Sequence, residues 1–192
     1  MDNRNDLFWK LVEPEHLKAR AFCRKLAGNR DEGDDLYQDS LVKALTGLAK
    51  LRDHNAFRPW LYRIIVNIFR GRAHKSFWKR YSSLDDKALK IPDNSDLAAS
   101  QAVKRRLSVA LNALSPENHA LIVLHDVEGW GIEELSRMFG KSQGNIRTRL
   151  SRSRKQMQKA LTRFFNKSDL SELKKTIQSE EKICVAVKSA KD

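Results

Sequence analysis

The chain has 192 residues, and its 37 Lys and Arg against 24 Asp and Glu give a formal net charge of +13. This excess favours a polyanionic partner. No apolar run approaches the roughly 18 residues of a membrane span, and the amino terminus lacks the apolar core of a signal peptide, so we expect no membrane insertion. The only cysteines, Cys23 and Cys184, are far apart. This argues against a disulfide framework or a cysteine-based zinc site and favours free thiols in a cytoplasmic protein.

Apolar residues recur at helical spacing along nearly the whole chain and alternate nowhere, which predicts an all-α fold. A first helix is expected over 15–27, ended by Gly28, and a second over 34–48. The third has the clearest pattern, because apolar residues from Phe57 to Phe69 recur at i, i+3, i+4, i+7 and onward. That stripe predicts a helix with one fully buried face.

The second half of the chain predicts another helical block, with helices over 103–114, 116–128, 132–139 and 142–165. A polar stretch containing Pro92 separates the two blocks and reads as a flexible linker. We therefore predict two small helical domains joined by a linker. The expected boundaries are 6–82 for the first domain, 83–102 for the linker, 103–165 for the second domain and 166–192 for a polar tail.

The segment from Ile132 has the pattern of a helix-turn-helix. Gly140 would end a short amphipathic helix and Ser142 would cap the longer basic helix that follows. The first turns of such a helix enter the major groove. The outward candidates for reading bases are Gln143, Asn145, Arg147, Thr148, Ser151 and Arg152, and those for phosphate contacts are Arg149, Arg154 and Lys155. The alternative is a solvated basic face on an ordinary helical hairpin.

A second basic region covers 54–81, which contains no acidic residue. Opposite the apolar stripe of the third helix, polar side chains recur at Arg63, Asn67, Arg70 and His74. Amide and cationic groups of this kind can contact single-stranded bases and their phosphates. Nearby Phe77 and Trp78 could stack on bases or simply pack in the protein.

An acidic cluster lies in the first domain, at Asp31, Glu32, Asp34, Asp35 and Asp39. It would repel phosphate. Favourable interaction with the helix dipole explains its first members but not Asp39 or the neighbouring Gln38, which favour a basic protein partner. Catalytic patterns are absent: there is no Gly-rich phosphate loop, HExxH or GxSxG, and the five histidines do not cluster at metal spacing. We expect no catalytic residue, no metal and no cofactor.

Three segments resemble motifs of bacterial RNA polymerase sigma factors. They are the acidic stretch from Asp34 to Leu45, the stretch from Phe57 to Asn67, and the segment from Leu114 to Arg154, which contains the helix-turn-helix and the residues that precede it. They occur in order with no domain between them, as in the compact extracytoplasmic-function (ECF) type, and the resemblance covers roughly residues 6–165. One departure is Gly131, where family members often have Ser or Thr as a helix cap.

The resemblance implies a sigma factor that binds core RNA polymerase and directs promoter-specific initiation. Asp35, Gln38 and Asp39 would contact the clamp helices of the β′ subunit. The loop 49–55 and the face with Arg63, Asn67, Arg70 and His74 would meet the melted minus-10 strand, and the helix-turn-helix would read the minus-35 element. The implied partners are core RNA polymerase (β′ clamp helices and β flap), promoter DNA and an anti-sigma factor, which family members often have.

Two other functions fit parts of this pattern. One is a helix-turn-helix transcriptional regulator that is not stably bound to polymerase; the acidic helix and the second basic region argue against it. The other is a basic nuclease, but neither basic region contains the carboxylate cluster that metal-dependent cleavage requires.

Overall fold

The computed structural model describes residues 3–82, 103 and 106–164. Within these ranges the chain forms helices and turns, with no strand, so the predicted all-α fold is confirmed. The predicted linker and carboxyl-terminal tail lie outside the described residues, as do the side chains of 73–82, which include His74, Phe77 and Trp78.

The first half folds into four α-helices, α1 (Asn3–Val12), α2 (His16–Ala27), α3 (Arg30–Gly47) and α4 (Phe57–Ser82). Short 3-10 turns lie between α1 and α2 at Glu13–Glu15 and between α3 and α4 at Leu48–Lys50 and His54–Ala56. In the second half residues 106–112 are helical. They are followed by α6 (Pro116–Ile122), a π-helical turn (Val123–Val127), α7 (Ile132–Phe139) and α8 (Gln143–Phe164).

Most predicted helix limits agree with the structure, and the differences have local causes. The prediction missed α1, a helix of 10 residues that buries Phe8 and Val12. Helix α3 begins at Arg30, four residues before the predicted start, because the Asn29 side chain caps it by accepting the Glu32 N–H at 2.9 Å. The predicted helix over 116–128 is α-helical only to Ile122, after which the π-helical turn takes over.

The first domain is built around the buried stripe of α4. Leu61 and Ile65 are fully buried, and they pack with Phe22 of α2 and Leu36 of α3 in one hydrophobic cluster. Helices α2 and α3 approach closely at Gly33, where an added Cβ would lie 2.4 Å from the Arg24 Cα. Glycine is therefore required there by the helix–helix contact rather than by backbone conformation.

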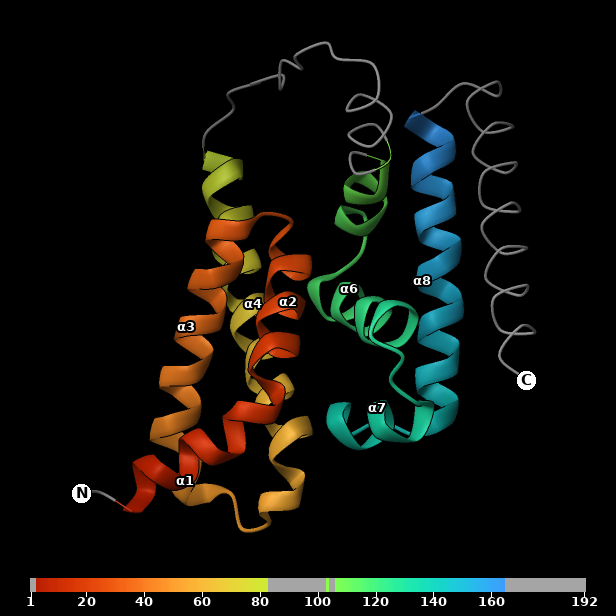
Figure 1. The fold of residues 1–192 in the computed structure, drawn as a ribbon. Coiled ribbons are helices and arrows are strands. Elements are labelled where there is room, and N and C mark those ends of the chain that lie inside the picture. The colour runs from red at the N-terminus through yellow and green to blue at the C-terminus, as the bar shows by residue number, and fades with distance from the viewer. Residues whose placement is uncertain (1–2, 83–102, 104–105, 165–192) are drawn as a thin grey trace, which may run out of the picture.

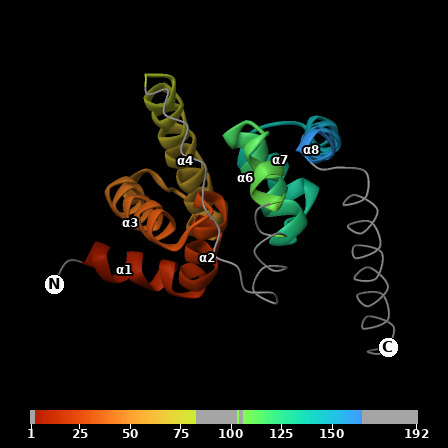
Figure 2. The ribbon, with the colours of Figure 1, turned by 90° about the horizontal axis from the view of Figure 1, so that it is seen from above.

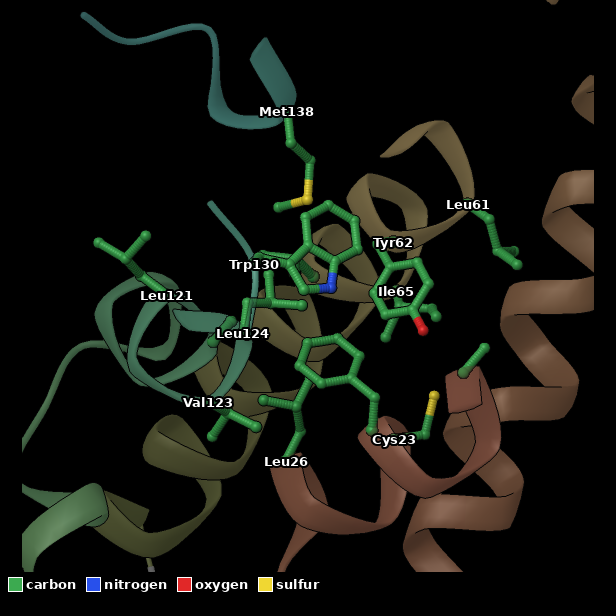
Figure 3. Close-up of a cluster of buried hydrophobic side chains, with 14 of the residues drawn as sticks. Cys23, Leu26, Leu61, Tyr62, Ile65, Leu121, Val123, Leu124, Trp130 and Met138 are labelled. Atoms are coloured by element: carbon green, nitrogen blue, oxygen red, sulfur yellow. The ribbon is translucent and has the colours of Figure 1, made fainter. Parts of the chain in front are cut away.

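The two halves share one continuous hydrophobic core. Helix α4 packs against α2 and α3 and also against α6 and α7 of the second domain, while α8 lies on the far side of α6 and α7 (Figures 1 and 2). At the junction Trp130, which precedes α7, is only 2% exposed, and its ring lies 4.8 Å from that of Tyr62 in α4 (Figure 3). The sequence predicted two helical domains but gave no sign of this contact.

Candidate nucleic-acid interface

The helix-turn-helix forms as its sequence predicts. Helix α7 ends at Gly140, whose φ of 63° is left-handed and whose N–H donates to the Ser136 carbonyl. Helix α8 follows after two residues, and the Ser142 hydroxyl accepts the Asn145 N–H at 3.2 Å. Because Ile146 and Leu150 are buried in the same hydrophobic cluster as Leu135, the first turns of α8 are fixed against α7.

The outward face of α8 carries the residues predicted to read bases. All six are exposed: Gln143, Asn145, Arg147, Thr148, Ser151 and Arg152. Two of them are engaged only within the helix, since Arg147 donates to the Gln143 side chain at 3.4 Å and the Thr148 hydroxyl donates to the Gly144 carbonyl at 2.9 Å. Their side chains are therefore placed to meet a ligand, and their reading of bases stays a prediction.

The three cations predicted to contact phosphates differ in their surroundings. Arg149 donates to Asn118 and to Glu117 of α6, at 2.6 to 2.9 Å, and is half-buried. Arg154 pairs with Asp126 in the π-helical turn. Lys155 is exposed and has no ion-pair partner among the described residues. The first two thus hold α8 to the rest of its domain, a role that the sequence did not indicate.

The polar face of α4 is also exposed. Arg63, Asn67 and Arg70 point away from the core, while Leu61, Ile65 and Val66 on the opposite side are buried. Neither arginine has an ion-pair partner in the part of the chain that the structure describes. The helical spacing therefore brings one amide and two unpaired guanidinium groups together, as predicted; the His74 side chain lies outside the described residues.

The polar face of α4 and the start of α8 line one cleft between the domains. Its volume is about 610 Å³, and it is lined by Arg63, Asn67 and Arg70 from α4 and by Lys141, Asn145 and Arg149 from the helix-turn-helix. A neighbouring cavity of about 660 Å³ lies between the 51–56 loop and α7. Sequence reasoning treated the faces as separate surfaces, because nothing in a helical pattern specifies how two helical domains are oriented.

The acidic cluster of α3 is only partly open at the surface. Asp35, Gln38 and Asp39 are exposed, and Asp39 pairs with Arg72 of α4. Asp34, in contrast, accepts bidentate hydrogen bonds from both Arg20 and Arg24 of α2, at 2.7 to 2.9 Å. These guanidinium groups hold the pKa of the Asp34 carboxyl well below its usual range. Asp34 is thus neutralised inside the domain and is not part of the surface open to a basic partner.

The described residues contain no group of three or more His, Cys, Asp and Glu side chains that could hold a metal ion.

None of the helices in the described ranges is long and apolar enough to cross a membrane. Two of the histidines contribute to packing: His119 is buried beside Phe69, and the His125 ring is 2.8 Å from the Trp130 carbonyl oxygen.

Comparisons with known proteins match both halves of the chain. The family models described as Sigma-70 region 2 and Sigma-70, region 4 match residues 11–80 and 104–157. RNA polymerase sigma factor YlaC of Bacillus subtilis is 31% identical over 134 residues, covering 67% of this chain and 77% of that protein. RNA polymerase sigma factor CarQ of Myxococcus xanthus is 28% identical over 164 residues, covering 83% and 92%.

A solved structure has the same fold. The sigma factor RpoE of Bartonella quintana, crystallised with the anti-sigma factor NepR, aligns with a TM-score of 0.58 and 26% identity. The alignment covers 80% of this chain and 97% of that one. Both domains of the chain are therefore included in the likeness.

Proposed function

The chain belongs to the sigma-70 family of RNA polymerase sigma factors, and within it to the ECF type. We propose that its two domains have different roles in the initiation of transcription. The protein binds core RNA polymerase and directs promoter-specific initiation of transcription. The first domain holds the polymerase and melts the minus-10 element, and the second reads the minus-35 element. The observation that carries this proposal is the pair of exposed basic faces, on α4 and α8, beside a separate exposed acidic face on α3.

The acidic face of α3 is proposed to bind the β′ clamp helices. Asp35, Gln38 and Asp39 are exposed on one side of the helix, and Asp39 pairs with Arg72 of α4. The Asp35→Lys/Gln38→Ala variant should lose co-purification with core polymerase and keep its helical circular dichroism, because substitutions at exposed positions change stability little. A matched control is Asp31→Lys at the start of α3, with the same change of charge. Wild-type polymerase binding by the double variant would refute the assignment.

The polar face of α4, with His74 beyond it, is proposed to bind the melted minus-10 strand. Asn67 lies one turn from both Arg63 and Arg70, so an amide that can pair with a base edge is flanked by two phosphate-binding cations. Asn67→Ala should spare polymerase binding but reduce open-complex formation at least tenfold, and a pre-melted promoter should restore part of the activity because the unpairing cost is already met. Unchanged permanganate reactivity of promoter thymines with this variant would contradict the proposal.

The exposed first turns of α8 are proposed to read the minus-35 element in the major groove. Replacing Arg147 or Arg152 with Ala should cost about 1–3 kcal/mol of binding free energy and relax preference at one base pair, if that guanidinium pairs with guanine. Selection of bound promoters from a randomised pool measures this. An unchanged profile for both variants would show that another face of α8 meets DNA.

Further features of the proposal follow from the family. The protein acts without catalysing a reaction itself, works in the cytoplasm, and contacts the β flap through its second domain. An anti-sigma factor is a proposed partner, since the Bartonella quintana relative was crystallised with one. The domain boundaries stay as predicted, 6–82 and 103–165. A regulator that does not bind polymerase is the alternative, and polymerase co-purification distinguishes the two.

A further inference from the structure

We infer that Arg72 of α4 lowers the affinity of the chain for core RNA polymerase, because it holds Asp39 in an ion pair that the polymerase has to break. The inference rests on the proposed function of the acidic face of α3. It assigns control over the strength of that contact to a residue outside the face, which competes with the polymerase for one of its carboxylates.

The two carboxylates of the acidic face differ in their surroundings. Asp39 accepts a hydrogen bond from the Arg72 guanidinium, which also donates to the Glu32 carbonyl at 3.4 Å. Asp35 is exposed and has no ion-pair partner among the described side chains. A protein that docks on this face therefore meets one carboxylate that is available at once and one that is already paired.

Arg72 does not belong to the surface proposed for DNA. Arg63, Asn67 and Arg70 line the cleft between the domains, and Arg72 is not among the residues that line it. Two residues along an α-helix correspond to a rotation of about 200°, so Arg72 leaves α4 nearly opposite to Arg70 and reaches α3 instead. The charge of Arg72 is therefore directed at the face proposed for the polymerase and not at the melted strand.

Apolar contacts, more than this ion pair, hold α4 against α3. Leu36 of α3 and Leu61 and Ile65 of α4 belong to one hydrophobic cluster, and each is at most 1% exposed. The Arg72 and Asp39 side chains, in contrast, are 36% and 60% exposed. Because apolar burial dominates the contact between the helices, the guanidinium can turn away from Asp39 while both helices stay in place.

Docking of a basic helix places two cations in competition for Asp39. A cation of the polymerase that reaches this carboxylate comes close to the Arg72 guanidinium, and like charges at short distance repel each other. The pair has to be broken for the new contact to form. Because an ion pair between partly exposed side chains contributes little free energy, we expect the competition to weaken polymerase binding by roughly two- to fivefold.

Removal of the Arg72 charge from the full-length chain tests the inference. Arg72→Gln should lower the Kd for core polymerase by roughly two- to fivefold at 0.1 M salt, and Arg72→Lys, which keeps the charge, should bind as the wild type does. Lys18→Gln is the matched control, because it removes the same charge from an exposed site on α2. Titration of core polymerase into each fluorescently labelled variant measures the Kd. An equal gain with Lys18→Gln would overturn the inference.

Two further measurements connect the gain in affinity to Asp39 and to charge. In the Asp39→Asn background Arg72→Gln should give a smaller gain, because no carboxylate is left to compete for and an unpaired Arg72 side chain can turn into solvent. Raising the salt from 0.1 M to 1 M shortens the Debye length from about 10 Å to about 3 Å, so the gain should also shrink. An equal gain in either experiment would contradict a competition between charges.

The measured affinities distinguish failure of this inference from failure of the proposed function. If the wild-type chain does not bind core polymerase, or if Asp39→Asn binds as tightly as the wild type, the function proposed for the acidic face fails and the inference fails with it. If Asp39→Asn binds more weakly but Arg72→Gln has an unchanged Kd, Asp39 serves both cations together and the inference alone is overturned. Asp34 already accepts hydrogen bonds from both Arg20 and Arg24 in this way. A higher Kd for Arg72→Gln would also overturn the inference, because Arg72 would then position Asp39 for the polymerase.

Discussion

Helices α4 and α8 carry the two basic faces of the molecule, but they use their cations differently. On α4, the described arginines of the polar face, Arg63 and Arg70, have no ion-pair partner in the described part of the chain. On α8, Arg149 and Arg154 are held by Asn118, Glu117 and Asp126 of their own domain, and only the more outward cations are left for a ligand.

The difference follows from how each helix is anchored. Helix α4 buries a wide apolar stripe that includes Leu61 and Ile65, so apolar burial dominates its packing, although Arg58 and Arg72 also form ion pairs. Helix α8 buries Ile146 and Leu150 in its first turns, but further along the buried position is Ser153, whose hydroxyl has no hydrogen-bond partner among the described residues. The ion pairs of Arg149 and Arg154 therefore help to hold α8 against the rest of its domain, where apolar burial by α8 is not sufficient.

The largest effect we expect concerns His119, which lies where α4 meets the second domain. It is 6% exposed, packs edge-on against Phe69, and burial lowers its pKa from 6.5 to about 4. Between pH 4 and pH 6.5 the unfolded chain binds more protons at this site than the folded chain does. The folded state is therefore most stable above pH 6.5, and this stability is lost as the pH falls toward 4. Lowering the pH to 4.5 should cost about 2.5 kcal/mol of unfolding free energy at this site.

Urea unfolding at pH 7 and pH 4.5 measures that loss. His119→Phe should remove it, because no group is then left to take up the proton. His54→Gln is the control, since His54 is exposed and its replacement should leave the pH dependence as in the wild type. The same pH dependence in His119→Phe and wild type would place the titrating group elsewhere.

The next effect separates anchoring from ligand-binding arginines on α8. Arg149→Ala removes three charge-assisted hydrogen bonds and leaves Glu117 and Asn118 without their partner. The free energy of unfolding should fall by about 2 kcal/mol. Arg147→Ala, two residues away and exposed, should change it by less than about 0.5 kcal/mol. Chemical denaturation of both variants measures the contrast; equal losses would contradict it.

A smaller effect compares Arg154 with its neighbour Lys155. Arg154→Ala breaks a half-exposed ion pair with Asp126, so stability should fall by no more than about 1 kcal/mol. Lys155→Ala should leave stability unchanged but reduce the slope of log K against log salt by about 1 for promoter binding. DNA-binding titrations at several salt concentrations test this. A reduced slope for Arg154→Ala as well would mean that Arg154 leaves Asp126 to contact phosphate.

The smallest effect concerns the first cap of the helix-turn-helix. Gly131 is the N-cap of α7 without a side-chain hydrogen bond, its φ of −69° suits any residue, and an added Cβ would meet nothing within 4 Å. Gly131→Ser should therefore raise the free energy of unfolding by a few tenths of a kcal/mol. Thermal unfolding can resolve this shift, and a lower melting temperature would show that Gly131 is needed for another reason.

The helices and the faces that they present could be predicted from the order of the residues alone. The stripe from Phe57 to Phe69 fixed which side of α4 is buried, because helical spacing and apolar burial are both local properties of the pattern. The turn at Gly140 and Ser142 was equally predictable, since a left-handed cap and a hydroxyl cap act within a few residues. The outward positions of Asn67 and Arg147 follow directly from those faces.

The partners of the charged groups and the way in which the domains meet depend instead on how the helices pack in three dimensions. The pairing of Asp34 with Arg20 and Arg24 depends on the distance between α2 and α3, and that of Arg149 with Glu117 on the angle between α6 and α8. The contact of Trp130 with Tyr62 joins residues 68 positions apart. Periodicity reports which face of a helix is apolar, but that face can be buried in many relative orientations, and side-chain packing selects one of them.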